Sequence, residues 1–384
     1  MKFPLNSNDR NNWLQLLNLF PILAFMRKTE LLKRFKAFCN GLKKTDRIAL
    51  LHHSDPDGFC SGLITMKAIK KITGKLPEYI SPYEYGNQEQ ADKLVRVTKR
   101  KKLNKLIVVD VGIDGGSNWK EMFVAFEEVL IIDHHKIYQD LNSKKVVFLK
   151  AKWFSKKDPA QYACSKLCFD LFNKIVDIKK TDWIASIGIF GDMSFRSWKS
   201  FVRKTVRESN FELELLCELL ELIAATEVMA EHRMGTLLME FYNAKSPRTL
   251  TKSVFCKYTK GLRKERDRLI NGFTEKADYY PEKELFVYEI KTDREGIKSY
   301  VINEISTVLP NQTIVVIQDS GNSDLRISGR RQDYKVKINE LMEKSVIGIP
   351  NSNAGGHIPA AAARIPKKYK AKFKKNLLRI AKKG

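Results

Sequence analysis

The stretch RIALLHHSDPDGFC, residues 47–60, joins a short apolar run to a cluster of polar side chains. The run is short and almost unbroken, as in a strand that is covered on both faces. Three more runs share this pattern: KLIVVD (105–110), VLIID (129–133) and KVVFL (145–149). Helical stretches are predicted between the runs, near 60–72, 88–102 and 118–127. This alternation predicts an α/β fold with a doubly wound, mainly parallel sheet.

A second, smaller α/β domain is predicted toward the C-terminus, after a mainly helical region. Its expected strands are ELFVYEI (284–290), QTIVVIQD (312–319) and DLRISGR (324–330), with helices at 298–309 and 335–344. The sequence therefore divides into five predicted parts: an N-terminal helical extension (1–45), the first α/β domain (46–195), a helical connector (196–280), the second α/β domain (281–366) and a basic tail (367–384).

Polar side chains gather where the apolar elements of the first domain end. His53, Asp55 and Asp57 follow the first strand, and their alternation projects them the same way in an extended segment. The same alternation favours His53 over the adjacent His52 as a site residue. Three more clusters end apolar elements, namely Asp110, Asp133-His134-His135 and Gly191-Asp192. The carboxyl ends of parallel strands form the functional crevice of such a sheet, so these groups are expected to converge there.

This set of carboxylates and imidazoles predicts a site for two divalent cations. Without a cation, carboxylates at close range repel one another and lose hydration. A mixed set of oxygen and nitrogen ligands suits Mn²⁺ best, with Mg²⁺ or Co²⁺ as alternatives. More candidate ligands are present than one tetrahedral ion needs, and paired ions are typical of phosphoryl-transfer sites. The alternative is that each Asp caps a turn and each His lies in the core; the shared location of all the clusters favours metal binding.

The charge of the chain points to a polyanionic partner. The 384 residues include 69 Lys and Arg against 44 Asp and Glu, a formal net charge of +25. Such an excess favours nucleic acid. Basic residues crowd 93–105 and 196–207, where Trp198 and Phe201 either stack on bases or pack an interdomain helix, with packing favoured. The tail 367–384 holds nine Lys or Arg and no acid, which suits a nucleic-acid arm or a solubilising tail.

The six cysteines include no CxxC pair, and their scatter predicts reduced thiols in a cytoplasmic protein rather than a disulfide framework. No run of about 18 apolar residues occurs, so no membrane partner is expected. The apolar stretch 13–26 has few preceding positive charges and no clear cleavage site, which favours a packing or partner helix over a signal peptide.

Six ordered motifs resemble those of the DHH phosphoesterase superfamily, which includes RecJ-like nucleases. HSDPDG, VVDVG, DHH and GD lie in the first domain, and LRISGR and NAGGH lie in the second. The last two are similar to motifs of the DHH-associated domain that follows the DHH domain in that family. Together the motifs span residues 53–357. Two positions depart from the family pattern: Leu51 stands where many members have His, and Ala354 replaces the first of three glycines.

The resemblance implies a role for each motif residue. His53, Asp55 and Asp110 would hold one metal ion. The second ion would be held by Asp57, Asp110, His134 and Asp192, with Asp110 bridging the two. His135 would contact the scissile phosphate, so the implied catalytic residues are Asp110, His134 and His135. The family hydrolyses phosphodiesters, or pyrophosphate in one branch, with a metal-bound hydroxide as the nucleophile, which agrees with the reading from the residues themselves.

The second domain is predicted to grip the substrate. Gly355 and Gly356 would let backbone N–H groups approach a phosphate, and the following IPAAAAR could open a helix that favours an anion at its N-terminus. Arg326 and Arg330 alternate on one strand and so share a face. The predicted substrate-binding residues are His135, Arg326, Ser328, Arg330, Asn353, Gly355, Gly356 and His357.

These observations favour a metal-dependent exonuclease that acts on single-stranded DNA or RNA, or on short oligonucleotides. One alternative is a phosphodiesterase for cyclic di-AMP or another dinucleotide, which would not need the widespread positive charge. Another is a non-catalytic DHH subunit of a replication helicase assembly, which would be expected to lose metal ligands that this sequence retains. Replication or repair proteins and a second copy of the chain are further candidate partners.

Overall fold

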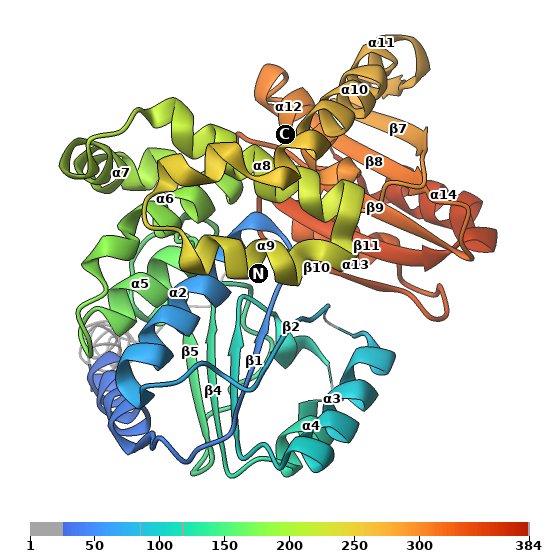
Figure 1. Ribbon diagram of the computed structural model, residues 1–384. Helices are drawn as coiled ribbons and strands as arrows, with labels where there is room; N and C mark the ends of the chain where they lie inside the picture. The colour runs from blue at the N-terminus through green and yellow to red at the C-terminus, as the bar shows by residue number, and fades with distance from the viewer. Residues whose placement is uncertain (1–25, 85, 117–118, 383–384) are drawn as a thin grey trace, which may run out of the picture.

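The apolar runs of the N-terminal half form a five-stranded parallel sheet in the computed structural model, which describes residues 26–84, 86–116 and 119–382 (Figure 1). The strands lie in the order β2-β1-β3-β4-β5. Their bounds are β1 (Ile48–His52), β2 (Tyr79–Pro82), β3 (Lys105–Val109), β4 (Glu128–Asp133) and β5 (Val146–Lys150). All residues of β1, β3 and β5 are buried, which explains why these runs are apolar throughout. The predicted parallel α/β sheet is confirmed, and β2 is a strand that the sequence did not predict.

Helices cover both faces of this sheet. One face packs against α2 (Pro56–Thr73), α5 (Cys164–Phe172), α6 (Asp182–Gly191) and a helix over residues 26–41, which buries Leu31 and Phe35. The other face packs against α3 (Gln88–Lys101) and α4 (Trp119–Val124). The carboxyl ends of the strands therefore remain open at one edge of the layer, where the polar motifs lie.

The helical connector joins the two domains. It contains α7 (Phe195–Ser209), α8 (Leu213–Ala230), α9 (Met234–Asn243), α10 (Lys257–Asn271) and α11 (Phe273–Lys276). Near its start, α8 packs Leu216 into the first core, and near its end it packs Val228 into the core that α12 (Ile297–Val308) also lines in the second domain. Trp198 and Phe201 of α7 pack against the first core, and the Trp198 indole N–H donates to the Gln161 carbonyl at 2.7 Å. Packing, rather than stacking on bases, accounts for both aromatic rings.

The second domain is a six-stranded mixed sheet with helices on both faces. The strand order is β10-β11-β9-β8-β7-β6, and within it β7 and β8 run parallel. The bounds are β6 (Asp278–Tyr280), β7 (Leu285–Lys291), β8 (Thr313–Asp319), β9 (Asp324–Arg330), β10 (Asn353–Gly356) and β11 (Ala360–Pro366). Helix α12 (Ile297–Val308) covers one face, and α13 (Ile338–Ser345) and α14 (Lys370–Ile380) cover the other.

Two predictions for this domain are wrong. The segment IPAAAAR does not open a helix, because Ala360–Pro366 is strand β11, paired with β9 and β10. Alternate residues Ala361, Ala363 and Ile365 are buried, so tertiary pairing overrides the helix propensity of the alanines. The basic tail is not a free arm either. Most of it forms α14, which buries Phe373 and Leu377 in the core of the second domain.

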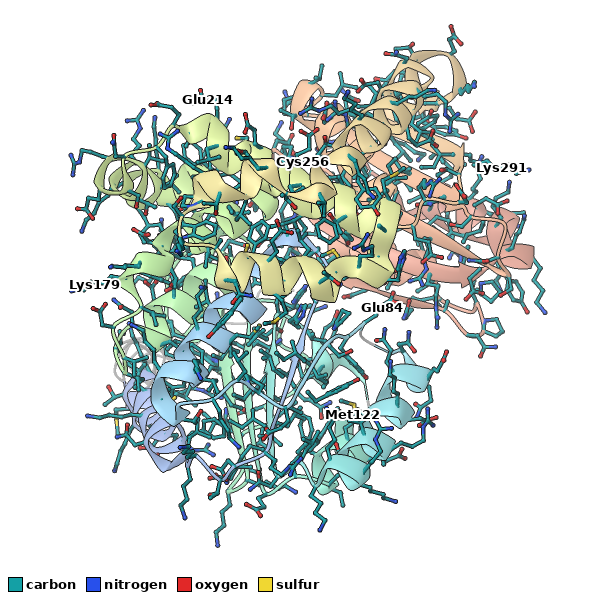
Figure 2. The ribbon with its side chains drawn as sticks, in the orientation of Figure 1. Glu84, Met122, Lys179, Glu214, Cys256 and Lys291 are labelled. Atoms are coloured by element: carbon teal, nitrogen blue, oxygen red, sulfur yellow. The ribbon has the colours of Figure 1, made fainter. Side chains whose placement is uncertain are left out.

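The structure also bears on the predictions for the cysteines, for membrane spans and for the N-terminal stretch. All six cysteines are free thiols. No helix within the described ranges is long and apolar enough to span a membrane. The expected helix at 13–26 lies outside the described residues, apart from Met26. Figure 2 shows Glu84 where the two domains face each other, and its carboxylate pairs with Arg326 of β9.

Candidate metal centre

The first part of the site is built by the turn between β1 and α2. Asp55 is the N-cap of α2 and accepts a hydrogen bond from the Gly58 N–H at 2.9 Å. Asp57 follows in the first turn of the helix and is buried. Its carboxylate accepts from the backbone N–H groups of Cys164 (2.6 Å) and Ser165 (3.1 Å) at the start of α5. The turn thus fixes two carboxylates at the carboxyl end of β1, and α5 orients the second.

The structure brings all six predicted ligands together in two groups. His53, Asp55 and Asp110 offer ligand atoms within 4.8 Å of one another, and so do Asp57, His134 and Asp192. His134 of the second group also contacts the first: its Nε2 is 3.3 Å from Asp110 Oδ1, and its Nδ1 is 3.3 Å from Asp192 Oδ2 of its own group. Two adjoining sets of three ligands are the arrangement that two divalent ions require.

Polar atoms at the centre of this site lack hydrogen-bond partners. Asp110 Oδ1, His134 Nδ1 and Asp192 Oδ2 are buried, and none of them has a hydrogen bond among the described residues. Buried polar atoms are normally satisfied, and unsatisfied acceptors that face one another are costly. A divalent cation satisfies carboxylate oxygens and an imidazole nitrogen at once. The residues present therefore fit divalent metal ions.

The backbone is strained at two of these positions. Asp110, directly after β3, has φ = 60°, and Met193, directly after Asp192, has φ = 54°. Residues other than glycine seldom adopt such values, although Asp and Asn tolerate them best. Strain of this kind persists where the surrounding structure fixes it and is concentrated at functional sites. Here it directs the Asp110 carboxylate into the group of ligands.

Burial and mutual repulsion shift the pKa values of the carboxylates. Burial, followed by the neighbouring Asp192, raises the pKa of Asp57 to about 7. Burial, followed by Asp55, raises the pKa of Asp192 to about 7. Burial and the charge of Asp57 also raise the pKa of Asp110. Protons therefore compete with metal ions for this site near neutral pH.

We expect the stabilisation by Mn²⁺ to grow with pH. In the metal-stripped protein the folded chain holds protons on Asp57 and Asp192 that the unfolded chain has already released, so its stability falls as pH rises from about 4 to about 7. Between pH 6 and pH 8 each carboxylate should become roughly tenfold more available to a cation. Thermal unfolding with a chelator and with Mn²⁺ at both pH values checks this. An equal rise of Tm at pH 6 and pH 8 would contradict it.

His53, rather than His52, lies with the ligands, as the alternation predicted. Its Nδ1 is 3.0 Å from Asp55 Oδ2, and it faces the interdomain cavity described below. The His52 ring turns away, and its Nδ1 lies 2.7 Å from the His53 carbonyl oxygen. Burial lowers the pKa of His52 to about 4. His52 is thus a neutral core residue.

Asp133 has a role that the sequence did not indicate. The buried ammonium of Lys150, at the end of β5, pairs with Asp133 and with Asp114, the latter at 2.8 Å. Asp133 Oδ1 also lies 2.7 Å from His135 Nδ1, and the same ammonium lies 3.3 Å from the carbonyl oxygens of His135 and Lys136. Because these contacts fix Nδ1 of His135, its Nε2 is directed away from Asp133.

His357 of the second domain lies against two histidines of the first domain. Its ring stacks on His135 with centroids 5.1 Å apart and an interplanar angle of 18°, and it lies 4.7 Å from the His134 ring. The His357 Nε2 atom is buried without a hydrogen-bond partner among the described residues. Three imidazoles from two domains thus lie close together. The substrate contacts that the resemblance implied for His135 and His357 remain predictions.

The two glycines before His357 have structural reasons to be glycine. Gly356 has φ = 143°, and a Cβ there would lie 2.5 Å from the Ala360 carbonyl oxygen. A Cβ on Gly355 would lie 2.9 Å from the Tyr138 hydroxyl of the first domain. These glycines allow the β10–β11 hairpin to form and to approach the first domain closely. Their predicted contact with a phosphate remains a prediction.

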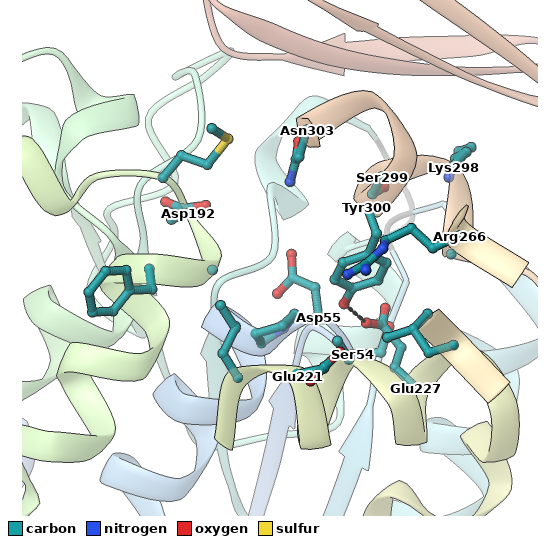
Figure 3. Close-up of a pocket in the computed structure, with 18 of the residues that line it drawn as sticks. Ser54, Asp55, Asp192, Glu221, Glu227, Arg266, Lys298, Ser299, Tyr300 and Asn303 are labelled. Carbon is teal, nitrogen blue, oxygen red and sulfur yellow. Dashed lines mark hydrogen bonds between the residues drawn. The ribbon is translucent and has the colours of Figure 1, made fainter. Parts of the chain in front are cut away.

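A cavity of about 1080 Å³ lies between the two domains beside the ligands (Figure 3). His53, Asp55 and Asp192 line one side, and Arg326 and Arg330 of β9 line another, so both arginines share a face as predicted. Helices α8, α10 and α12 form much of the remaining wall. Burial lowers the pKa of Arg330 to about 10. The other predicted substrate contacts are not part of this lining, namely His135, Ser328, Asn353, Gly355, Gly356 and His357.

Sequence reasoning missed the residues that α8 and α12 contribute to the cavity, among them Glu227, Lys298 and Tyr300. Glu227 belongs to a helix with many glutamates, and Tyr300 lies in a predicted helix of ordinary composition. Nothing in the local pattern separates them from solvent-facing residues of an amphipathic helix.

Two family models match the chain. The model of the DHH family, N-terminal domain, matches residues 47–189, and the model of the DHHA1 domain matches residues 283–383. A search of curated proteins found no match.

Solved structures share the fold at low sequence identity. A DHH-domain protein described as belonging to a family of ribosomal proteins aligns with a TM-score of 0.69 and 14% identity, over 95% of this chain and 91% of its own. An exonuclease RecJ bound to manganese aligns with a TM-score of 0.64 and 15% identity, over 91% of this chain and 94% of its own. RecJ from Thermus thermophilus in complex with Mn²⁺ aligns with a TM-score of 0.66 and 14% identity. That match covers 91% of this chain and 54% of the Thermus protein, so the chain spans about half of its length.

Proposed function

We propose, from the premise that the chain belongs to the DHH family and carries a DHHA1 domain, that it is a metal-dependent phosphodiesterase that shortens single-stranded nucleic acid from an end. The observation that carries this proposal concerns Asp110, His134 and Asp192, which belong to two adjoining groups of three candidate ligands. Each of the three has a buried side-chain atom that lacks a hydrogen bond among the described residues. Phosphodiester hydrolysis is the chemistry that paired divalent ions in such a site support.

The residues divide into two roles. His53, Asp55 and Asp110 would hold one ion, and Asp57, His134 and Asp192 the other, with Asp110 shared; Mn²⁺ suits this mixed set best. When bound, the ions supply Lewis acidity at the phosphate and lower the pKa of a coordinated water. His135 and His357 stand beside them as imidazole donors to phosphate oxygens, and Arg330 adds positive charge within the cavity.

The exposed basic surface favours a nucleic-acid strand over a small nucleotide as the substrate. The basic side chains of α3 and α7 are exposed: Lys93, Arg96, Lys99 and Arg100 on α3, and Arg196, Lys199, Arg203, Lys204 and Arg207 on α7. With a net charge of +25, these helices can neutralise phosphates well beyond the nucleotide that is cleaved. A dinucleotide would need positive charge only inside the cavity.

A hydrolysis assay with added Mn²⁺ tests the proposal. The substrates are end-labelled single strands of RNA and DNA, dinucleotides and cyclic di-AMP. Stepwise shortening of long strands is the expected result. Cleavage confined to the dinucleotides or to the cyclic compound would instead assign a small-nucleotide phosphodiesterase. A lack of hydrolysis of every substrate would favour a non-catalytic DHH protein.

Replacing His357 by Ala should mainly weaken substrate binding. The variant loses one hydrogen bond to a charged phosphate, worth about 1.5–3 kcal/mol, so KM should rise by roughly tenfold or more while kcat changes little. Steady-state kinetics on the preferred strand measures both. His232→Ala, at an exposed histidine of the connector, is the matched control. If His357→Ala lowered the affinity for Mn²⁺ and left KM unchanged, the assigned role would be wrong.

A further inference from the structure

A carboxylate outside the two ligand groups is held in the wall of the cavity. Glu227 of α8 accepts a hydrogen bond on Oε2 from the Tyr300 hydroxyl of α12 at 2.7 Å (Figure 3). Within the described part of the chain, its Oε1 receives no hydrogen bond, and the carboxylate forms no ion pair within 4 Å. One oxygen is thus fixed in position and the other is free to accept a hydrogen bond from a ligand.

The surroundings of Glu227 limit the kind of ligand that can bind to its Oε1 atom. Burial raises the pKa of Glu227 to about 7, and above that pH its negative charge repels a phosphate. A metal ion would need several ligand atoms close together, and Glu227 belongs to none of the potential metal-binding groups among the described residues. The remaining kind of ligand is a neutral group that donates a hydrogen bond. Carboxylates recognise ribose hydroxyls in nucleotide sites by accepting their hydrogen bonds.

The position of Glu227 favours the sugar over the base. Glu227, His53 and Asp55 line the same cavity, and Glu227 is close enough to Asp55 for their charges to interact. Figure 3 shows Asp55 and the Glu227–Tyr300 pair facing this common space. In a nucleotide the ribose is bonded directly to the phosphate, whereas the base lies farther away. A side chain this near the phosphate site therefore meets the sugar first.

We propose that Glu227, oriented by Tyr300, accepts a hydrogen bond from a ribose 2′-hydroxyl and makes the enzyme prefer RNA to DNA. This inference rests on the proposed function and specifies its substrate class. The 2′-hydroxyl is the group that allows a protein to distinguish RNA from DNA at a given position. A site that is built to bind a substrate hydroxyl discriminates strongly against the analogue that lacks it.

Oligonucleotides that differ at one sugar test the inference. The terminal nucleotides carry 2′-OH, 2′-H or 2′-F on an otherwise identical strand, and kcat/KM is measured with Mn²⁺. The wild-type protein should favour 2′-OH over 2′-H by roughly tenfold or more. The 2′-F strand should behave like the 2′-H strand, because fluorine cannot donate a hydrogen bond.

Variants locate the preference at Glu227. Glu227→Ala should reduce the ratio of kcat/KM for 2′-OH over 2′-H to about twofold or less, and Glu227→Gln, which keeps a neutral acceptor, should give an intermediate ratio. Tyr300→Phe should lower the ratio partly. Glu221→Ala is the matched control, because Glu221 lines the same cavity from α8 but is bound by Arg263 at 2.6 Å. This control should keep the wild-type ratio.

The outcomes separate this inference from the proposed function. If strands are hydrolysed and Glu227→Ala keeps the wild-type ratio, the inference is overturned and the phosphodiesterase stands. If the effect of Glu227→Ala follows the identity of the base rather than the sugar, the inference is also overturned. If the wild-type protein hydrolyses no strand, both proposals fall. Should Glu227→Ala fail to fold, an unchanged ratio in Tyr300→Phe overturns the inference.

Discussion

Asp110→Asn should abolish Mn²⁺-dependent hydrolysis, with kcat/KM lower by about 10³-fold or more. Asp110 is the residue that we propose both ions share: it lies with His53 and Asp55 in one group, and its Oδ1 is 3.3 Å from Nε2 of His134 in the other. An amide in its place removes the negative charge that a bridging ligand contributes, so both ions are held less tightly. The loss should therefore appear in metal affinity as well as in the rate.

Asparagine is the better replacement because of the backbone at this position. Asp110 has φ = 60°, which Asn tolerates nearly as well as Asp, whereas Ala would add strain. The variant should thus fold normally, which circular dichroism can verify. Asp92→Asn on the exposed side of α3 is the matched control and should keep full activity. Retention of more than a tenth of the wild-type kcat/KM by Asp110→Asn would exclude the shared role.

Lys150→Met should be the most destabilising single substitution outside the ligands, with a loss of about 3–5 kcal/mol in the free energy of unfolding. The side chains of Lys150, Asp114 and Asp133 are fully buried, and the one ammonium binds both carboxylates. Its removal leaves two buried carboxylates without the cation that they share, although the contacts with His135 and with the Tyr138 N–H remain. Because Asp133 also positions His135, the substitution should lower activity too.

Urea unfolding of the metal-stripped protein measures this loss. Lys152→Met, two residues farther along at an exposed position, is the matched control and should change the free energy of unfolding by less than about 0.5 kcal/mol. Adding Asp114→Asn and Asp133→Asn to the Lys150→Met protein should recover part of the stability, because the unpaired charges are removed. A loss below about 1 kcal/mol for Lys150→Met would show that the buried ammonium is not the main partner of the two carboxylates.

The sequence predicted where the candidate ligands gather, because local rules place these residues. Short apolar runs that end in Asp or His indicate buried parallel strands, and the topology of such sheets brings their carboxyl ends together. Even the choice of His53 over His52 followed from strand alternation. Lys150 was missed because it directly follows an apolar run, where a lysine normally marks the exposed end of a strand. Only the tertiary structure shows that Asp114 and Asp133 surround it.

Features that depend on contacts between distant segments could not be predicted in this way. The alanines of β11 favour a helix locally, and pairing with β9 and β10 outweighs that preference. The contact between Glu227 and Tyr300 joins the connector to the second domain, and neither residue carries a local signal. The family resemblance implied a substrate contact for His135 and for His357, but the stacking of the two rings was not predicted and is known only from the structure.

Crystals grown with Mn²⁺ and measured at an X-ray energy where manganese scatters anomalously give the most direct test. Two anomalous peaks are predicted, about 3.5–4 Å apart. One should be bounded by His53, Asp55 and Asp110, and the other by Asp57, His134 and Asp192, with Asp110 contacting both. The absence of any peak at these residues, or a single peak held by His134, His135 and His357, would contradict the two-metal site on which the proposed function depends.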